Sequence, residues 1–219
     1  MKTAYFTGCA RAVCHWVLVL LVATLSAPAR SETTLRTSSV SPSVNAASPQ
    51  VVAASPAANT GESWLLIDAT TATLSVMRGS AVVKRFDDVA FGRLGTKPVH
   101  YLGDTSTPLG EMRINGISNS AFTLFFSLDY PTSQHAKMAL DAGKITREQY
   151  LSIFNAGLEG RKPPNSTPLG GDIGIHGLGS APLSIHRQYN WTRGCVALDN
   201  QQIRALAAYV RVGMRVVIK

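Results

Sequence analysis

Short runs of apolar and β-branched residues, separated by tight turns, open the folded part of this chain. The runs cover residues 64–68, 73–77 and 81–86, and Gly79 with Ser80 supplies the second turn. Runs of this length and composition, bounded by turn residues, are typical of strands joined as a β-meander. A further short run, 89–92, ends at Gly92. The pattern predicts a mainly β domain.

Strand-like runs recur at 111–115, 122–128, 173–176 and 214–218, and helical patterns interrupt them only locally. Residues 133–142 and 146–156 predict a helical pair that serves either as a lid over the site or as a packing wedge. Thr146 and Gln149 make a capping box for the second of these helices. A third helix is expected after Asp199 or Asn200, since Ile203, Leu206, Ala207 and Val210 follow helical spacing. We therefore expect two or three peripheral helices.

The first 61 residues differ from the rest in composition. Lys2 and Arg11 precede an apolar run, and small residues follow it, which is the pattern of a signal peptide over residues 1–29. An uncleaved anchor is the alternative. Residues 30–61 are rich in Ser, Thr, Ala and Pro and predict a flexible linker. We expect an exported protein, in the periplasm or cell wall, whose folded domain spans 62–219 and which has no stable membrane span once the signal is removed.

The formal charge of the whole chain is +8. A nucleic-acid partner is conceivable for a basic protein, but no basic platform with interleaved aromatic residues occurs. An exported protein that faces an anionic wall polymer has equal reason to be basic. We expect no nucleic-acid partner, and the oligomeric state stays open.

Cys195 is the one cysteine left after loss of Cys9 and Cys14 with the signal peptide. A free thiol in an oxidising compartment indicates a reactive group or an intermolecular bridge. A cysteine nucleophile needs a base, and His176, at the end of a predicted strand, is the best candidate. Gly194 lets a substrate carbonyl approach, and amides there can face a developing oxyanion.

The run from Asn190 to Leu198, with His176-Gly177 before it, resembles the signature of the YkuD-domain L,D-transpeptidases, in the branch that writes Trp-Thr-x-Gly-Cys-x-Ala-Leu. The likeness extends over residues 64–219 and includes the Thr-Pro-Leu-Gly element that ends at Gly110. It implies a two-sheet β-sandwich of the YkuD type. It also implies a Cys195 nucleophile, a His176 base oriented by the carbonyl of Gly177, and no metal or cofactor.

The activity that this resemblance implies is acyl transfer on peptidoglycan stem peptides through a thioester. The acceptor is an amine of a stem peptide, a protein lysine or a D-amino acid, and with water the same residues make a wall peptidase or amidase. Trp191, Thr192 and Arg193 are expected to bind substrate. Arg193 and Asn190 depart from the family pattern, so neither takes over the family's role there.

Other interpretations remain beside this one. Cys195 is a buried hydrophobe in one, and in another it joins His176 and His186 in a zinc site with wide ligand spacing. A wall-binding module with a vestigial site is a third. His186 alone is expected to be a loop or surface histidine, and Arg193 has a surface ion pair with Asp172 or Asp199 as its simplest role. The loop 157–171 leads directly to His176 and is long enough to be functional.

Overall fold

The first three strands form the predicted antiparallel meander. The computed structural model describes residues 61–219, so the predicted signal peptide and all but the last residue of the predicted linker lie outside the described residues. Strands β1 (Ser63–Asp68), β2 (Thr73–Arg78) and β3 (Ala81–Phe86) pair in order, β1 with β2 and β2 with β3. The meander prediction is confirmed.

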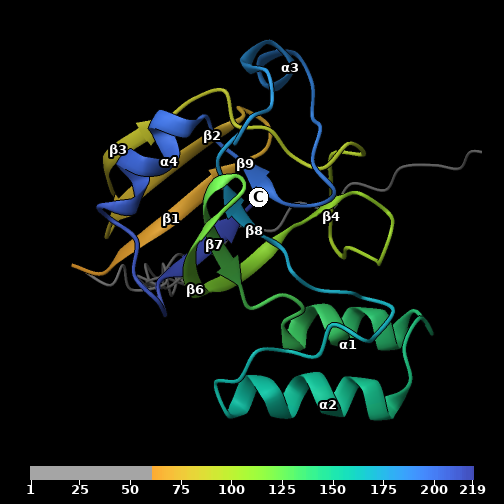
Figure 1. Ribbon diagram of the computed structural model, residues 1–219. Helices are drawn as coiled ribbons and strands as arrows, with labels where there is room; N and C mark the ends of the chain where they lie inside the picture. The colour runs from red at the N-terminus through yellow and green to blue at the C-terminus, as the bar shows by residue number, and fades with distance from the viewer. Residues whose placement is uncertain (1–60) are drawn as a thin grey trace, which may run out of the picture. The chain divides into compact units, whose positions relative to one another are not determined.

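Eight strands make one large mixed sheet in the order β3-β2-β1-β10-β6-β7-β8-β9 (Figure 1). The later members are β6 (Gly110–Ser120), β7 (Thr123–Leu128), β8 (Gly174–His176), β9 (Val196–Ala197) and β10 (Arg215–Ile218). The C-terminal strand β10 lies inside the sheet, parallel to β1 and antiparallel to β6. A small sheet pairs β4 (Thr96–Lys97) with β5 (Thr107–Pro108).

The long strand β6 belongs to both halves of the large sheet. Its first residues pair with β10 and its later residues pair with β7, with a bulge between Ile114 and Gly116. A bulge bends the strand that carries it. The two sheets that the family resemblance implies are thus joined through β6 into one eight-stranded sheet, and the mainly β prediction is confirmed.

One apolar core connects the two halves of the sheet. Its fully buried members come from β1, β6, β7, β8, β9, β10 and the last helix, and they include Leu65, Ile67, Met112, Phe126, Ile175, Val196, Ile203 and Val216. Alternate residues of each strand point to the same face, so the core side of β8 and β9 is taken by Ile175 and Val196. The opposite face of these two strands is left for His176 and its neighbours.

Four helices occur within residues 61–219, one more than expected. They are α1 (Ser133–Asp141), α2 (Arg147–Leu158), α3 (Leu183–Gln188) and α4 (Asn200–Ala207). The Thr146 and Gln149 capping box is confirmed, with each side chain bonded to the other residue's amide. Asp199 caps α4 through the amides of Gln201 and Gln202. The short α3 follows Pro182 and carries His186, where the sequence predicted a loop.

The predicted strand at 89–92 contributes only two isolated bridges, Ala90 with Ala197 and Gly92 with Thr192. It serves to tie the residues around Cys195 to the meander. The helical pair α1 and α2 lies at the opposite end of the domain from α3 (Figure 1). No helix within residues 61–219 has the length and apolar character needed to cross a bilayer.

Candidate active site

The pairing of β8 with β9 brings His176 and Cys195 together. These strands are parallel, with Ile175 opposite Val196 and His176 opposite Ala197. Cys195 immediately precedes β9, so its side chain and that of Ala197 leave the same face of the strand, which is also the face of His176. The two residues are therefore diagonal neighbours across the pair. The sequence prediction that they meet agrees with this register.

A single orientation is imposed on the His176 ring. Its Nδ1 lies 2.7 Å from the carbonyl oxygen of Gly177, and its side chain is only 4% exposed. Because a carbonyl can only accept, Nδ1 carries the proton and Nε2 presents a lone pair. Burial lowers the pKa of His176, so the ring is neutral at neutral pH. His176 has the tautomer of a general base.

Aromatic rings pack around this imidazole. Phe122, at the turn between β6 and β7, lies with its ring centroid 4.5 Å from that of His176, and Trp191 meets His176 edge-on at 5.7 Å. The amide of Gly177 donates to the carbonyl of Phe122 across 3.0 Å, which fixes the hairpin turn beside the site. A Cβ on Gly177 would lie 2.7 Å from that same carbonyl oxygen. Gly177 is therefore required for close packing as well as for its carbonyl.

The Cys195 thiol is half-buried, and its Sγ lies 3.6 Å from the carbonyl oxygen of Asp172. Burial raises the pKa of Cys195 to about 11, and the negative charge of Asp172 adds to the effect. The thiol is therefore protonated at neutral pH while His176 is neutral. The resting pair is a thiol beside an imidazole, and a thiolate forms only when His176 removes the proton.

Thr192 closes the turn that carries Cys195. Its hydroxyl donates to the Cys195 carbonyl across 2.6 Å and accepts from the Gly194 amide at 3.1 Å. The Thr192 amide also donates to the Phe91 carbonyl, and the Thr192 carbonyl accepts from the Arg93 amide. Thr192 is buried. The Thr192 hydroxyl therefore holds the turn, and the substrate contact expected of Thr192 stays a prediction.

Gly194 has a packing role beside the one expected. Its backbone has a φ of +131°, and a Cβ there would meet Ile173, the carbonyl of Ser106 and His100 within 3.1 Å. Since its amide is already bonded to Thr192, it is not available for an oxyanion. Gly194 permits the turn to pack closely against Ile173 and the Ser106 carbonyl.

Trp191 connects His176 with His186. Its indole nitrogen donates to His186 Nδ1 across 3.3 Å, while the ring edge lies against His176. His186 is 4% exposed, so the prediction of a surface histidine is wrong. Burial lowers the pKa of His186, and the neutral ring then accepts the indole bond at Nδ1. Its Nε2 has no hydrogen-bond partner among residues 61–219.

Arg193 is exposed, and no ion pair or hydrogen bond of its side chain occurs in the described part of the chain. The two carboxylates offered as partners are engaged elsewhere. Asp172 pairs with Lys162 at 2.6 Å, and Asp199 caps α4. The surface ion pair expected as the simplest role is therefore absent in residues 61–219.

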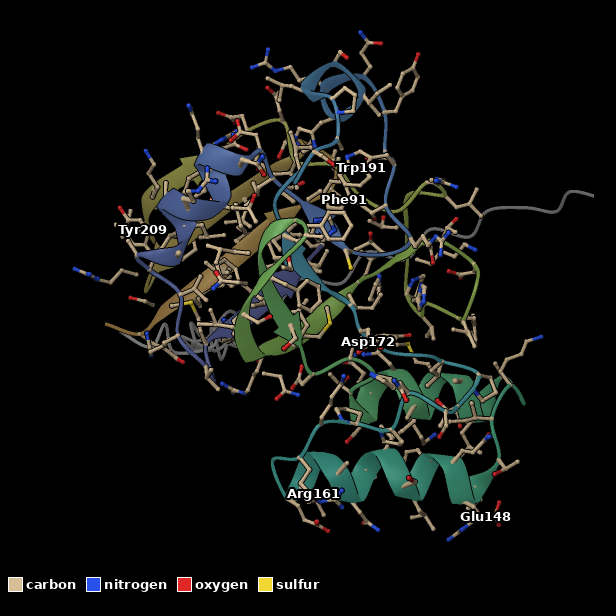
Figure 2. The ribbon with its side chains drawn as sticks, viewed as in Figure 1. Phe91, Glu148, Arg161, Asp172, Trp191 and Tyr209 are labelled. Carbon is tan, nitrogen blue, oxygen red and sulfur yellow. The ribbon has the colours of Figure 1, made fainter. Side chains whose placement is uncertain are left out.

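Sequence reasoning missed Asp172 and Phe122, which both contact the Cys/His pair. Asp172 has a positive φ of 56° and ends the loop that follows α2 (Figure 2). Its acidic side chain gives no signal, because its contact with Cys195 is made by the backbone carbonyl. The sequence placed Phe122 at the start of a predicted strand, so nothing indicated that its ring lies against His176. No group of three or more His, Cys, Asp or Glu side chains suited to a metal ion occurs within residues 61–219.

The sequence model of the L,D-transpeptidase catalytic domain, YkuD, matches residues 62–218. The chain belongs to this family. The YkuD fold of the L,D-transpeptidases is thus the fold described above, a large mixed sheet with a small sheet and peripheral helices. No curated protein sequence matches the chain.

Solved structures with a similar fold include several L,D-transpeptidases. Bd1075 of Bdellovibrio bacteriovorus is 19% identical, with a TM-score of 0.46, over 73% of this chain and 48% of that one. The helical cell shape determining protein Pgp2 from Campylobacter jejuni is 18% identical, with a TM-score of 0.48, over 74% and 51%. The L,D-transpeptidase of Xylanimonas cellulosilytica, residues 123–326, is 15% identical, with a TM-score of 0.39, over 73% and 61%. The YkuD-family chain spans about half the length of the first two.

Proposed function

We propose that this protein is a peptidoglycan L,D-transpeptidase that uses Cys195 as its nucleophile. The observation that carries the proposal is the orientation of His176, whose Nδ1 is bonded to the Gly177 carbonyl so that Nε2 is free to accept a proton on the face shared with Cys195. Membership of the YkuD family supports the substrate class. Export to the periplasm or cell wall, directed by residues 1–29, is part of the same proposal.

The first step is acylation of the thiol. His176 Nε2 takes the Sγ proton as sulfur attacks the carbonyl carbon of the donor residue's L-centre in a stem tetrapeptide. The C–N bond to the terminal D-alanine then breaks, and the proton held by His176 passes to the leaving amine. The product is a thioester between Cys195 and the tripeptide.

The oxyanion of this step needs hydrogen-bond donors. The Gly194 amide is bonded to Thr192, whereas the amides of Arg193 and Cys195 have no acceptor among residues 61–219. Amide donors aimed at a developing oxyanion are worth about 10²–10³-fold in rate. We assign the oxyanion to these two amides.

The second step transfers the acyl group. An amine attacks the thioester carbon, His176 accepts the amine proton, and the C–S bond breaks to release the thiol. The aromatic rings of Phe122 and Trp191 pack against His176, and we assign to them the exclusion of water that transfer to an amine requires. Arg193, exposed two residues before the thiol, is the group that we assign to a carboxylate of the donor peptide.

Incubation of the purified protein with tetrapeptide muropeptides tests the proposal by mass spectrometry. We expect a tripeptide adduct on the peptide that contains Cys195, and a cross-linked product when a second stem is present. Cys195→Ala should abolish both while its melting temperature stays unchanged. Free tripeptide as the sole product would identify a hydrolase instead, and an adduct that persists in Cys195→Ala would exclude the thiol as nucleophile.

A further inference from the structure

The side chain of Asn200 does not cap the helix that it begins. Asn200 is the first residue of α4, and the cap is provided by Asp199 immediately before it. The Asn200 amide instead reaches two distant segments, the loop that follows His176 and the turn between β6 and β7. The partners lie 21 and 77 residues away in the sequence, so the side chain serves to hold these segments together.

Two hydrogen bonds join the Asn200 amide to the backbone of Gly179. Asn200 Oδ1 accepts from the Gly179 amide across 2.9 Å, and Nδ2 donates to the Gly179 carbonyl across 2.8 Å. Because a backbone amide can only donate and a carbonyl can only accept, this pair requires both an oxygen and an N–H on the side chain. A carboxylate at position 200 would instead place an oxygen against the Gly179 carbonyl.

The same side-chain oxygen holds the hairpin turn beside the site. Asn200 Oδ1 also accepts from the Thr123 hydroxyl across 2.8 Å. Thr123 has a positive φ of 75°, which is uncommon for a β-branched residue and persists where surrounding contacts hold it. It directly follows Phe122, whose ring centroid lies 4.5 Å from that of His176. The hydrogen bond therefore fixes the backbone from which this ring projects.

Asn200 also lies directly against Gly177, the residue whose carbonyl orients the His176 ring. A Cβ on Gly177 would lie 2.8 Å from Asn200 Oδ1 and 2.7 Å from the Phe122 carbonyl oxygen. The Gly177 amide donates to that Phe122 carbonyl, and the bonds from Asn200 to Gly179 follow two residues later. The Gly177 carbonyl is therefore held from both sides, 2.7 Å from His176 Nδ1.

We propose that Asn200 is a positioning residue for the base, because its amide fixes both the carbonyl that sets the His176 tautomer and the turn that carries the Phe122 ring. The inference rests on the proposed function, in which His176 Nε2 presents its lone pair to the Cys195 proton. Asn200 lies five residues after Cys195 in the same segment, so its amide also joins the backbone of the nucleophile to that of the base. A displacement of about 1 Å in a catalytic group can cost about 10²-fold in rate.

The His176 tautomer in Asn200→Asp and Asn200→Ala tests the proposal directly. Long-range ¹H–¹⁵N spectra of neutral histidine rings distinguish a protonated Nδ1 from a protonated Nε2, and loss of signals in His176→Ala identifies those of His176. We expect a protonated Nδ1 in the parent protein and a mixture with protonated Nε2 in both variants. The measurement needs no turnover, so a parent protein without transfer activity would count against the proposed function and leave this test intact.

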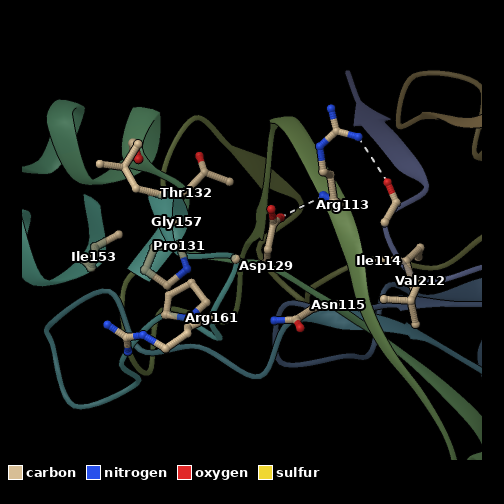
Figure 3. A pocket seen from close by; sticks show the side chains of 15 residues that line it. Arg113, Ile114, Asn115, Asp129, Pro131, Thr132, Ile153, Gly157, Arg161 and Val212 are labelled. Atoms are coloured by element: carbon tan, nitrogen blue, oxygen red, sulfur yellow. Dashed lines mark hydrogen bonds between the residues drawn. The ribbon is translucent and has the colours of Figure 1, made fainter. Parts of the chain in front are cut away.

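Acylation kinetics give the second readout. We expect kcat to fall about tenfold or more in both variants, with KM within about twofold of the parent value, because only the base is displaced. Asn115→Asp is the matched control. Asn115 is a half-buried asparagine of β6 that lines a separate cleft beside α2, and none of the residues assigned to the reaction lines that cleft (Figure 3). This control should keep the parent tautomer and rate.

Asn200→Asp keeps the size of the side chain and the two hydrogen bonds that Oδ1 accepts, and an acidic residue is favourable in the first turn of a helix. It therefore tests the proposal even where Asn200→Ala is too unstable to measure. An unchanged His176 tautomer would overturn the proposal whatever the melting temperature, since Asn200 would then serve stability alone. A shifted tautomer with the parent rate would contradict it as well.

Discussion

The Thr192 hydroxyl donates to the carbonyl oxygen of Cys195 across 2.6 Å and receives the Gly194 amide at 3.1 Å. One buried oxygen thus links the beginning and the end of the turn that carries the thiol. A second hydroxyl, that of Thr107, lies 3.4 Å from the same Cys195 carbonyl. The position of the nucleophile therefore depends on hydrogen bonds to its own backbone.

Thr192→Val removes both bonds and keeps the shape of the side chain. The buried Gly194 amide loses its acceptor, at a cost of about 1–3 kcal/mol, and the Cys195 carbonyl keeps only the longer bond from Thr107. We expect a lower melting temperature and an acylation rate reduced at least tenfold. Thr192→Ser, which keeps the hydroxyl, should restore most of both. A Thr192→Val variant with the melting temperature and rate of the parent protein would show that the turn is held by other contacts.

The ionisation of Cys195 is open to direct measurement by iodoacetamide, which reacts with the thiolate. Since burial raises the pKa of Cys195 to about 11, we expect the alkylation rate to keep rising with pH through that value. Asp172→Asn removes a nearby negative charge and should shift the profile to lower pH, although burial remains the larger effect. Asparagine tolerates the positive φ at this position. A profile that levels off near the ordinary cysteine pKa of about 8.5 would contradict the buried thiol.

The Cys195 and His176 pair was proposed from a glycine-flanked thiol, a histidine at a predicted strand end and the YkuD resemblance, and the register of β8 with β9 is compatible with it. The supporting contacts were not predictable. The Thr192 hydroxyl accepts from the Gly194 amide, and Gly194 packs against the Ser106 carbonyl from a distant segment. Asp172 contacts Cys195 through its backbone carbonyl. Such roles depend on the relative position of distant segments, which periodicity does not encode.

His176→Ala should lower the acylation rate by about 10²–10⁴-fold, the usual contribution of a general base. Burial lowers the pKa of His176 below its ordinary value of 6.5, so the base form persists to lower pH than for a free imidazole. The acid limb of kcat/KM should therefore have its midpoint below 6.5 in the parent protein. The variant should lack that limb. An identical acid limb in His176→Ala would assign it to another group.

The strands and caps of the fold were predictable for a related reason. The meander 63–86 has local turns, and the Thr146 and Asp199 caps bond within three residues of themselves. By contrast, the order of strands across the sheet is non-local, since β10 lies between β1 and β6. The short α3 was missed because its exposed Leu183 and Ile185 give no single apolar stripe. Its one buried side chain is that of His186, which is polar.

His186→Leu should leave the Trp191 indole nitrogen without its acceptor and so free the ring that packs against His176. We expect kcat to fall about tenfold with a smaller effect on KM, because an orphaned buried donor costs about 1–3 kcal/mol. The emission maximum of Trp191 should shift as its environment changes. His186→Gln offers an amide oxygen in place of Nδ1 and should recover much of the loss. If leucine and glutamine variants behave alike, His186 is needed only for packing.

Arg193 is exposed and has no ion pair within the described residues, so its guanidinium is available to a ligand. Two roles predict different kinetics. A carboxylate clamp holds the donor peptide through a bidentate pair, which arginine forms more effectively than lysine. A tuning charge would instead favour the Cys195 thiolate through space.

Arg193→Gln distinguishes these roles. Loss of a clamp should raise KM for the donor peptide about tenfold or more and leave the pH profile of Cys195 alkylation unchanged, which is the result that we expect. Arg193→Lys should recover part of the affinity, because it keeps the charge without the bidentate geometry. Loss of a tuning charge should move the alkylation profile to higher pH, since less thiolate would form at each pH. Arg187→Gln, on α3, provides a control for the removal of one exposed positive charge. If neither KM nor the alkylation profile changes, Arg193 has no part in the site.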